Sequence, residues 1–136
     1  MSDFSVYTAE QIRDWMSQGV VASPPSNLYV ALFDSSGNEV SGDFQNDRVE
    51  TTTGADWEPT DTDTTSFENV NNLNFGEATV DVNGVVDVAL YDDTLANGGN
   101  EIARYEIDDA PFDVATGTNH IFLIGELEFN IRDRTE

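Results

Sequence analysis

The side chains that could carry out chemistry are few in kind. His120 is the single histidine, at the start of an apolar stretch, and the chain has no cysteine. Thiolate chemistry is therefore excluded, and one chain cannot build a histidine-rich zinc site. The motifs G-x-S-x-G, H-E-x-x-H and G-x-x-x-x-G-K-S/T do not occur. We predict that the protein is not an enzyme and that His120 has a structural role.

Carboxylates are the remaining candidates. Asp and Glu together number 27, so neighbouring acids such as Asp108 and Asp109 are expected by chance. A small hydrolase that uses two carboxylates as acid and base stays an alternative.

The segment "YDDTLANGGNE" combines oxygen ligands with glycines, as loops that bind calcium or magnesium do. Its candidate metal ligands are Asp92, Asp93 and Glu101. Counted from Asp92, however, the third and fifth positions are Thr94 and Ala96, which departs from the EF-hand spacing. A solvated hairpin loop without a cofactor is the favoured interpretation, and a structural cation at these three residues is the alternative.

The charge is strongly one-sided. The 27 acidic residues face five basic residues, all of them arginine, and the formal net charge is −22. Such a surface repels itself at physiological ionic strength, whereas about 1 M salt shortens the screening length to roughly 3 Å. The absence of lysine is typical of halophilic proteins, and we expect folding and assembly to depend on salt. Phosphate backbones and anionic membranes would repel this surface, so we expect neither nucleic acid nor a membrane as a partner.

The segment "VYTAEQIRDWMSQG" predicts one helix, over about 8–18. Thr8 and Gln11 stand at capping-box spacing, and a glycine follows the last turn. Ile12, Trp15 and Met16 form one apolar stripe that is expected either to close an open end of the fold or to bind an adjacent subunit. The early acid and short apolar runs predict neither a signal peptide nor a membrane anchor.

Short apolar segments then recur at roughly ten-residue spacing, with turn residues between them. They predict strands within 28–133 of a single domain spanning 1–136. The Thr- and Asp-rich stretch at about 50–66 is expected to be a loop. The pattern predicts a mainly β fold, an antiparallel β-sandwich of jelly-roll or Ig-like type with one N-terminal α-helix.

Three details of these strands can be checked. "LYVALF" (28–33) is expected to be a buried strand, and Asp34 to start the turn that follows it. Glu39 is expected on the surface. In the final segment, alternation places five residues on one inward side: Ile121, Leu123, Leu127, Phe129 and Ile131.

Two long segments carry a family likeness: "SPPSNLYVALFDSSGNEVSGDFQNDRVETTT" and "VNNLNFGEATVDVNGVVDVALYDDTLANGGNEIARYEIDDAPFDVATGTNHIFLIGELEFNI". In them the chain resembles a family of small structural proteins of tailed phages and proviruses. The matching positions are Pro25, Leu28–Phe33, Glu39–Gly42, Arg48, Val88–Asp92, Gly98–Ile102, Val114 and Gly117. The segment "VDVNGVVDV" departs from the family, in which a Trp-Gly turn is common there.

The resemblance implies a virion accessory protein of the tail-fibre, minor-tail or capsid-decoration kind, with no catalytic residues to transfer. Together with the composition, it implies a tailed virus or provirus of a haloarchaeon, whose protein is made in the cytoplasm of a halophilic host. We expect a homo-oligomer, a trimer or a pentamer, that docks to other virion proteins. The expected interface residues are Ile12, Trp15 and Met16.

A binding module is the alternative from another class. A β-sandwich that binds a host surface glycan or receptor would be favoured if its aromatic side chains lay together on one exposed face. The residues concerned are Trp57, Tyr91 and Tyr105.

Overall fold

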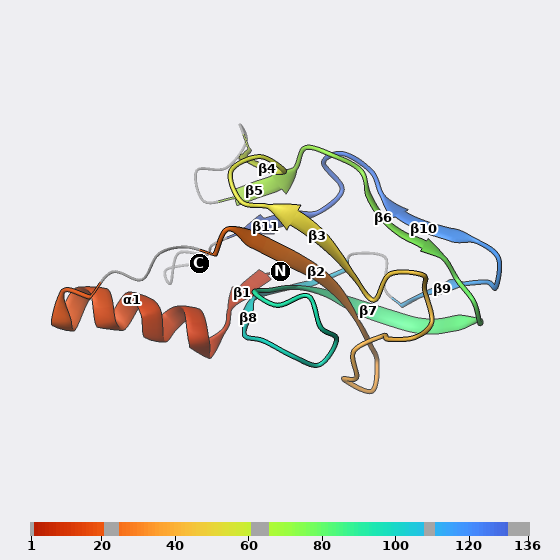
Figure 1. Ribbon diagram of the computed structural model, residues 1–136, viewed down its shortest axis with the longest axis horizontal. Coiled ribbons are helices and arrows are strands. Elements are labelled where there is room, and N and C mark those ends of the chain that lie inside the picture. The colour runs from red at the N-terminus through yellow and green to blue at the C-terminus, as the bar shows by residue number, and fades with distance from the viewer. Residues whose placement is uncertain (1, 21–24, 61–65, 108–110, 131–136) are drawn as a thin grey trace.

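The computed structural model describes residues 2–20, 25–60, 66–107 and 111–130, which form eleven strands and one helix (Figure 1). The helix and strands are β1 (Ser2–Phe4), α1 (Val6–Gln18), β2 (Asn27–Asp34), β3 (Arg48–Thr52), β4 (Trp57–Pro59), β5 (Ser66–Asn69), β6 (Leu73–Glu77), β7 (Val82–Tyr91), β8 (Glu101–Glu106), β9 (Phe112–Val114), β10 (Asn119–Phe122) and β11 (Glu128–Asn130).

The larger layer is an antiparallel sheet in the order β1-β8-β7-β2-β3, with β9 also paired to β7. β2 lies between β7 and β3, and Val30 and Leu32 point from it into the core. Ala31 and Phe33 alternate to the opposite face and are buried there as well. Burial on both faces explains the continuous apolar run, and it confirms the strand expected at 28–33.

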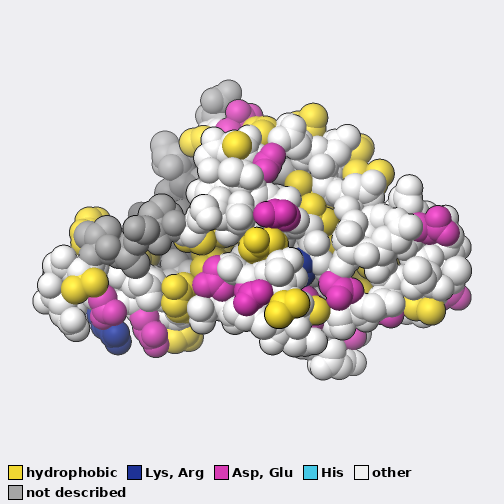
Figure 2. Space-filling model, in the orientation of Figure 1, with side chains coloured by type: hydrophobic (Ala, Val, Ile, Leu, Met, Phe, Trp, Pro, Cys, Tyr) yellow, Lys and Arg dark blue, Asp and Glu magenta, His cyan; other side chains and the backbone are white. Residues whose placement is uncertain are grey.

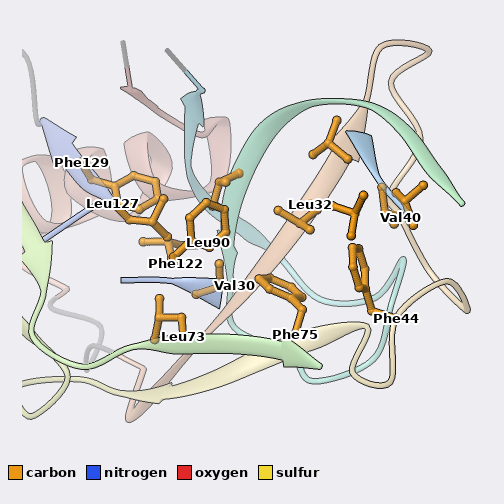
Figure 3. Close-up of a cluster of buried hydrophobic side chains, with 14 of the residues drawn as sticks. Val30, Leu32, Val40, Phe44, Leu73, Phe75, Leu90, Phe122, Leu127 and Phe129 are labelled. Carbon is orange, nitrogen blue, oxygen red and sulfur yellow. The ribbon is translucent and has the colours of Figure 1, made fainter. Parts of the chain in front are cut away.

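Two short antiparallel sheets form the second layer, β6 with β10, and β4-β5-β11. Side chains from both layers meet in one core, most of which Figure 3 shows. Its largest fully buried apolar members are Phe75, Phe129, Leu32, Leu90 and Leu127. Burying each such side chain contributes roughly 1.5–3 kcal/mol, so this core is the main source of stability. The arrangement confirms an antiparallel β-sandwich with one N-terminal helix.

Two strands lie where the sequence did not indicate them. β4 falls inside the stretch 50–66 that was expected to be a loop, and Trp57 is the residue of β4 that reaches the core. Residues 61–65 of that stretch lie outside the described residues. β1 adds an edge strand to β8, pairing Phe4 with Ala103. Three residues are too few to show a periodicity, so only the pairing reveals them.

The inward residues expected in the final segment are partly wrong. Leu127 and Phe129 are buried, but Ile121 and Leu123 are exposed, and Phe122 points inward between them. The register of β10 shifts between His120 and Ile121, and a turn closed by Glu126 N–H donating to Leu123 O separates β10 from β11. A bulge and a turn each reverse the alternation of a strand. Ile131 lies outside the described residues.

Candidate assembly surface

Helix α1 is attached to the sheet by its first turn. Ser5 Oγ accepts a hydrogen bond from Thr8 N at 3.1 Å, and Thr8 Oγ1 donates to the carbonyl of Ile102 in β8 at 2.8 Å. Gly19 ends the helix in the left-handed conformation, at φ 68°. The helix begins at Val6, two residues before the expected start, because extended Ser5 takes the N-cap position in place of Thr8. In the described part of the chain, no helix is long and apolar enough to cross a membrane.

Beyond this attachment, α1 projects away from the sandwich, at the left of Figure 1. None of its residues is buried. Ile12, Trp15 and Met16 are 38%, 56% and 78% exposed, and Figure 2 shows hydrophobic side chains along this end of the molecule. The helix therefore does not close the sandwich. We call α1 with its exposed apolar stripe the arm. The structure brings the three expected interface residues to one side of it.

A second apolar surface lies at one edge between the two layers. It is a groove of about 230 Å³ lined by Leu28, Thr53, Gly54, Trp57, Glu58, Pro59 and Phe67. Trp57 Nε1 donates a 2.8 Å hydrogen bond to Thr51 Oγ1, which in turn donates to the carbonyl of Leu28. The indole also meets Phe67 edge-on, with centroids 5.6 Å apart. These contacts fix the groove wall before any partner arrives.

One acidic residue, Glu58, is among those that line this groove, and it belongs to a row of three acids. Glu58, Glu68 and Glu128 lie directly opposite one another across β4, β5 and β11. Directly paired residues of antiparallel strands place their side chains on the same face, where like charges destabilise the sheet. None of the three forms an ion pair with another described residue. Screening by salt or an incoming positive charge would relieve this repulsion.

The aromatic residues of the glycan-binding alternative do not gather on one face. Trp57 is 9% exposed, with its indole directed into the core. Tyr105 packs against the same core. Tyr91 lies on the opposite face of the larger sheet, stacked on Phe33. The aromatic platform that would favour this alternative is therefore not formed by these residues.

The three proposed metal ligands lie around one loop, and protein donors bond to at least one carboxylate oxygen of each. Asp92 accepts two hydrogen bonds from Asn100, and Asp93 accepts one from Leu95 N. Glu101 Oε1 pairs with Arg104 at 2.5 Å. Among the described residues, no group of three or more His, Asp or Glu side chains converges as a metal site would. A structural cation here stays a prediction.

Glu39 is buried, so its expected place on the surface is wrong. Arg48 donates to both of its carboxylate oxygens, Nε to Oε2 at 2.9 Å and Nη2 to Oε1 at 2.7 Å. The two side chains are 1% and 0% exposed. Arg48 Nη1 also donates to the carbonyls of Asp93 and Gly98. The pair therefore holds the 93–98 loop against the sheet.

Arg48 begins a column of stacked side chains on the outer face of the larger sheet. Its guanidinium lies 4.0 Å from the ring centroid of Tyr91, which stacks on Phe33, and Arg104 lies 3.9 Å from the centroid of Phe33. These four side chains surround Ala31 and Ala89, so this face is covered without a further layer. In the sequence, this column of stacked side chains is indicated only by the alternation of small and aromatic residues in β2 and β7.

His120 has the structural surroundings that the sequence predicts. Its ring stacks on Phe112 at 4.8 Å and meets Phe122 edge-on at 4.6 Å. Nε2 is buried without a hydrogen-bond partner. Burial lowers the pKa of His120 below its usual value of 6.5, and the charge of Glu126 opposes this shift. A neutral imidazole enclosed by phenyl rings is poorly placed to exchange protons with a substrate.

The geometry therefore offers two apolar surfaces for contact, the arm and the groove, on a rigid β domain. None of the curated proteins compared with the chain matches it. A family model described as "Podophage GP4 fiber I protein gp80" matches residues 3–130, nearly the whole chain. The description of this family is that of a fibre protein, which is a structural component of the virion. The chain belongs to the podophage GP4 fiber I protein family, and is a phage fibre-like structural protein of the virion.

Proposed function

We propose that this protein is a fibre component of a tailed virus or provirus of a halophilic archaeon and assembles there with copies of itself through the arm. The observation that carries the proposal is the exposed stripe of Ile12, Trp15 and Met16 on a helix whose hydrogen bonds to the sandwich are made at its N-terminal end. Large exposed apolar side chains grouped on a monomer mark an interaction site. Attachment to other virion proteins uses the surfaces that self-assembly leaves free.

High salt is part of the proposal. Copies carrying a charge of −22 each repel one another strongly at low ionic strength. At about 1 M salt the screening length falls to roughly 3 Å, so apolar contact can then outweigh the repulsion. The acidic row at Glu58, Glu68 and Glu128 adds a local reason for this dependence. The absence of lysine supports a halophilic host.

The test is sedimentation velocity in about 1 M KCl and after dialysis into low-salt buffer without divalent cations. We expect an oligomer in high salt that dissociates in low salt. Trp15→Ser combined with Met16→Ser should be monomeric in high salt, since both side chains are exposed and their loss leaves the core intact. Leu95→Ser is the matched control, because Leu95 is 68% exposed but lies outside the arm. A monomeric wild-type protein in high salt, or an oligomeric double variant, would refute the proposal.

A further inference from the structure

The arm is too short to assemble by pairing with another arm. Its 13 residues span about 20 Å, fewer than two heptads, whereas coiled coils need at least three or four. A stable interface buries roughly 800 Å² on each partner, and one short helix face supplies only a part of that area. The stripe therefore needs a groove on its partner, because amphipathic helices bind proteins by laying their apolar face into a hydrophobic groove. The groove between the two layers is such a surface.

The groove has the chemistry that fits the stripe. Its lining includes the apolar residues Leu28, Trp57, Pro59 and Phe67. Among the described residues, the groove is open at the edge where β3 and β4 end their sheets. Apolar knobs spaced as in Ile12, Trp15 and Met16 insert into grooves of this kind.

Charge supports the same pairing. Glu58 lines the groove and belongs to the acidic row with Glu68 and Glu128, none of which is in an ion pair with another described residue. Arg13 lies three residues before Met16 and so on the same side of the arm. Of the three arginines that the structure describes, Arg48 is buried and Arg104 is held by two carboxylates. The side chain of Arg13 is 64% exposed, and its partner among the described residues is its neighbour Asp14. Exposed ion pairs contribute little in water, so Arg13 can exchange this partner for Glu58.

We propose that the arm of each copy docks in the groove of the next copy, with Trp15 as the anchor and Arg13 beside Glu58. This inference rests on the proposed function and specifies the partner surface. Each copy then donates one arm and accepts another, so the interface is head-to-tail. Such an interface closes into a ring or continues as a filament, depending on the rotation between neighbours.

The first test compares two single variants in about 1 M KCl by sedimentation velocity. Trp15→Ala removes the anchor. Gly54→Asn places a side chain in the groove, and asparagine tolerates the positive φ of 82° at this position. Gly42→Asn is the matched control, with φ 75° and equally open space at Cβ, but outside the groove. We expect Trp15→Ala and Gly54→Asn to be folded monomers by circular dichroism, and Gly42→Asn to assemble as the wild type does.

Mixing the two monomeric variants gives the decisive result. Trp15→Ala keeps an intact groove and Gly54→Asn keeps an intact arm, so a head-to-tail interface predicts that the mixture forms dimers and nothing larger. An interface between two arms predicts instead that Gly54→Asn assembles by itself. That outcome would overturn the inference while leaving the proposed function intact. If Trp15→Ala by itself, and the double variant Trp15→Ser with Met16→Ser by itself, both assembled as the wild type does, the inference and the proposed function would both be overturned.

A charge exchange tests the orientation within the groove. Arg13→Glu and Glu58→Arg should each weaken assembly or alter its salt dependence, since each places like charges together. The two changes combined should restore assembly towards the wild-type level. Equal assembly of all three variants across salt concentrations would overturn the contact between Arg13 and Glu58.

Discussion

Replacing Glu39 by glutamine should destabilise the protein strongly, because it leaves the Arg48 charge buried beside a neutral group. Both side chains are almost fully inaccessible, and two direct hydrogen bonds of 2.9 and 2.7 Å join them. Asn97 N also donates to Glu39 Oε1, at 3.0 Å. The change therefore affects the sheet and the 93–98 loop together.

The magnitude follows from what remains around Arg48. Removing one partner of a buried ion pair typically costs about 3–5 kcal/mol. Arg48 keeps hydrogen bonds to two carbonyl oxygens, of Asp93 and Gly98, so we expect the lower end, about 3 kcal/mol. With the slope usual for urea unfolding of small proteins, this lowers the midpoint by about 1–3 M.

Urea unfolding at low and high KCl checks this expectation, because urea itself carries no charge. Buried pairs are screened little, so the loss for Glu39→Gln should be nearly the same in both salts. Glu101→Gln is the control, since Glu101 and Arg104 are 28% and 31% exposed. It should cost less than about 1 kcal/mol, and less still in high salt. A loss for Glu39→Gln as small and as salt-dependent as that of the control would refute the reasoning.

Two further expectations concern the core. Because burial lowers the pKa of His120 in the folded protein, the unfolded chain binds its proton more readily, and stability should fall as the pH drops through 6.5. His120→Phe should remove this part of the loss in stability. If the urea midpoint falls by the same amount between pH 7.5 and pH 5 in the wild type and in His120→Phe, this expectation is contradicted. Trp57→Phe removes the hydrogen bond to Thr51 and should cost about 1–3 kcal/mol. A double-mutant cycle with Thr51→Val should then show coupling, and strictly additive losses would argue against this bond.

Several features follow from local sequence alone. The continuous apolar run at 28–33 and the acceptor side chain of Asp34, which takes hydrogen bonds from Ser36 N and Asn38 N, form as predicted. The helix and its glycine end also form, with a start displaced by two residues. These features depend on interactions within a few residues, which composition and spacing reveal.

The prediction of which residues of the final segment point inward was partly wrong, for a physical reason that the sequence does not show. The bulge after His120 and the turn at Leu123 each shift the alternation by one step. A strand broken in this way keeps its apolar composition while its residues change sides. Only pairing with β6 and β5 shows which of them reach the core.

The sequence by itself determined the β-rich class, the amphipathic helix and the extreme charge, and with them the expectation of a salt-dependent assembly protein. The tertiary structure decided that Glu39 is buried against Arg48, that no residue of the arm is buried, and that Leu28 and Phe67 both line a groove. The difference is physical. Helix and strand patterns arise between near neighbours in the chain, whereas a buried ion pair or a groove depends on which distant strands become neighbours in space.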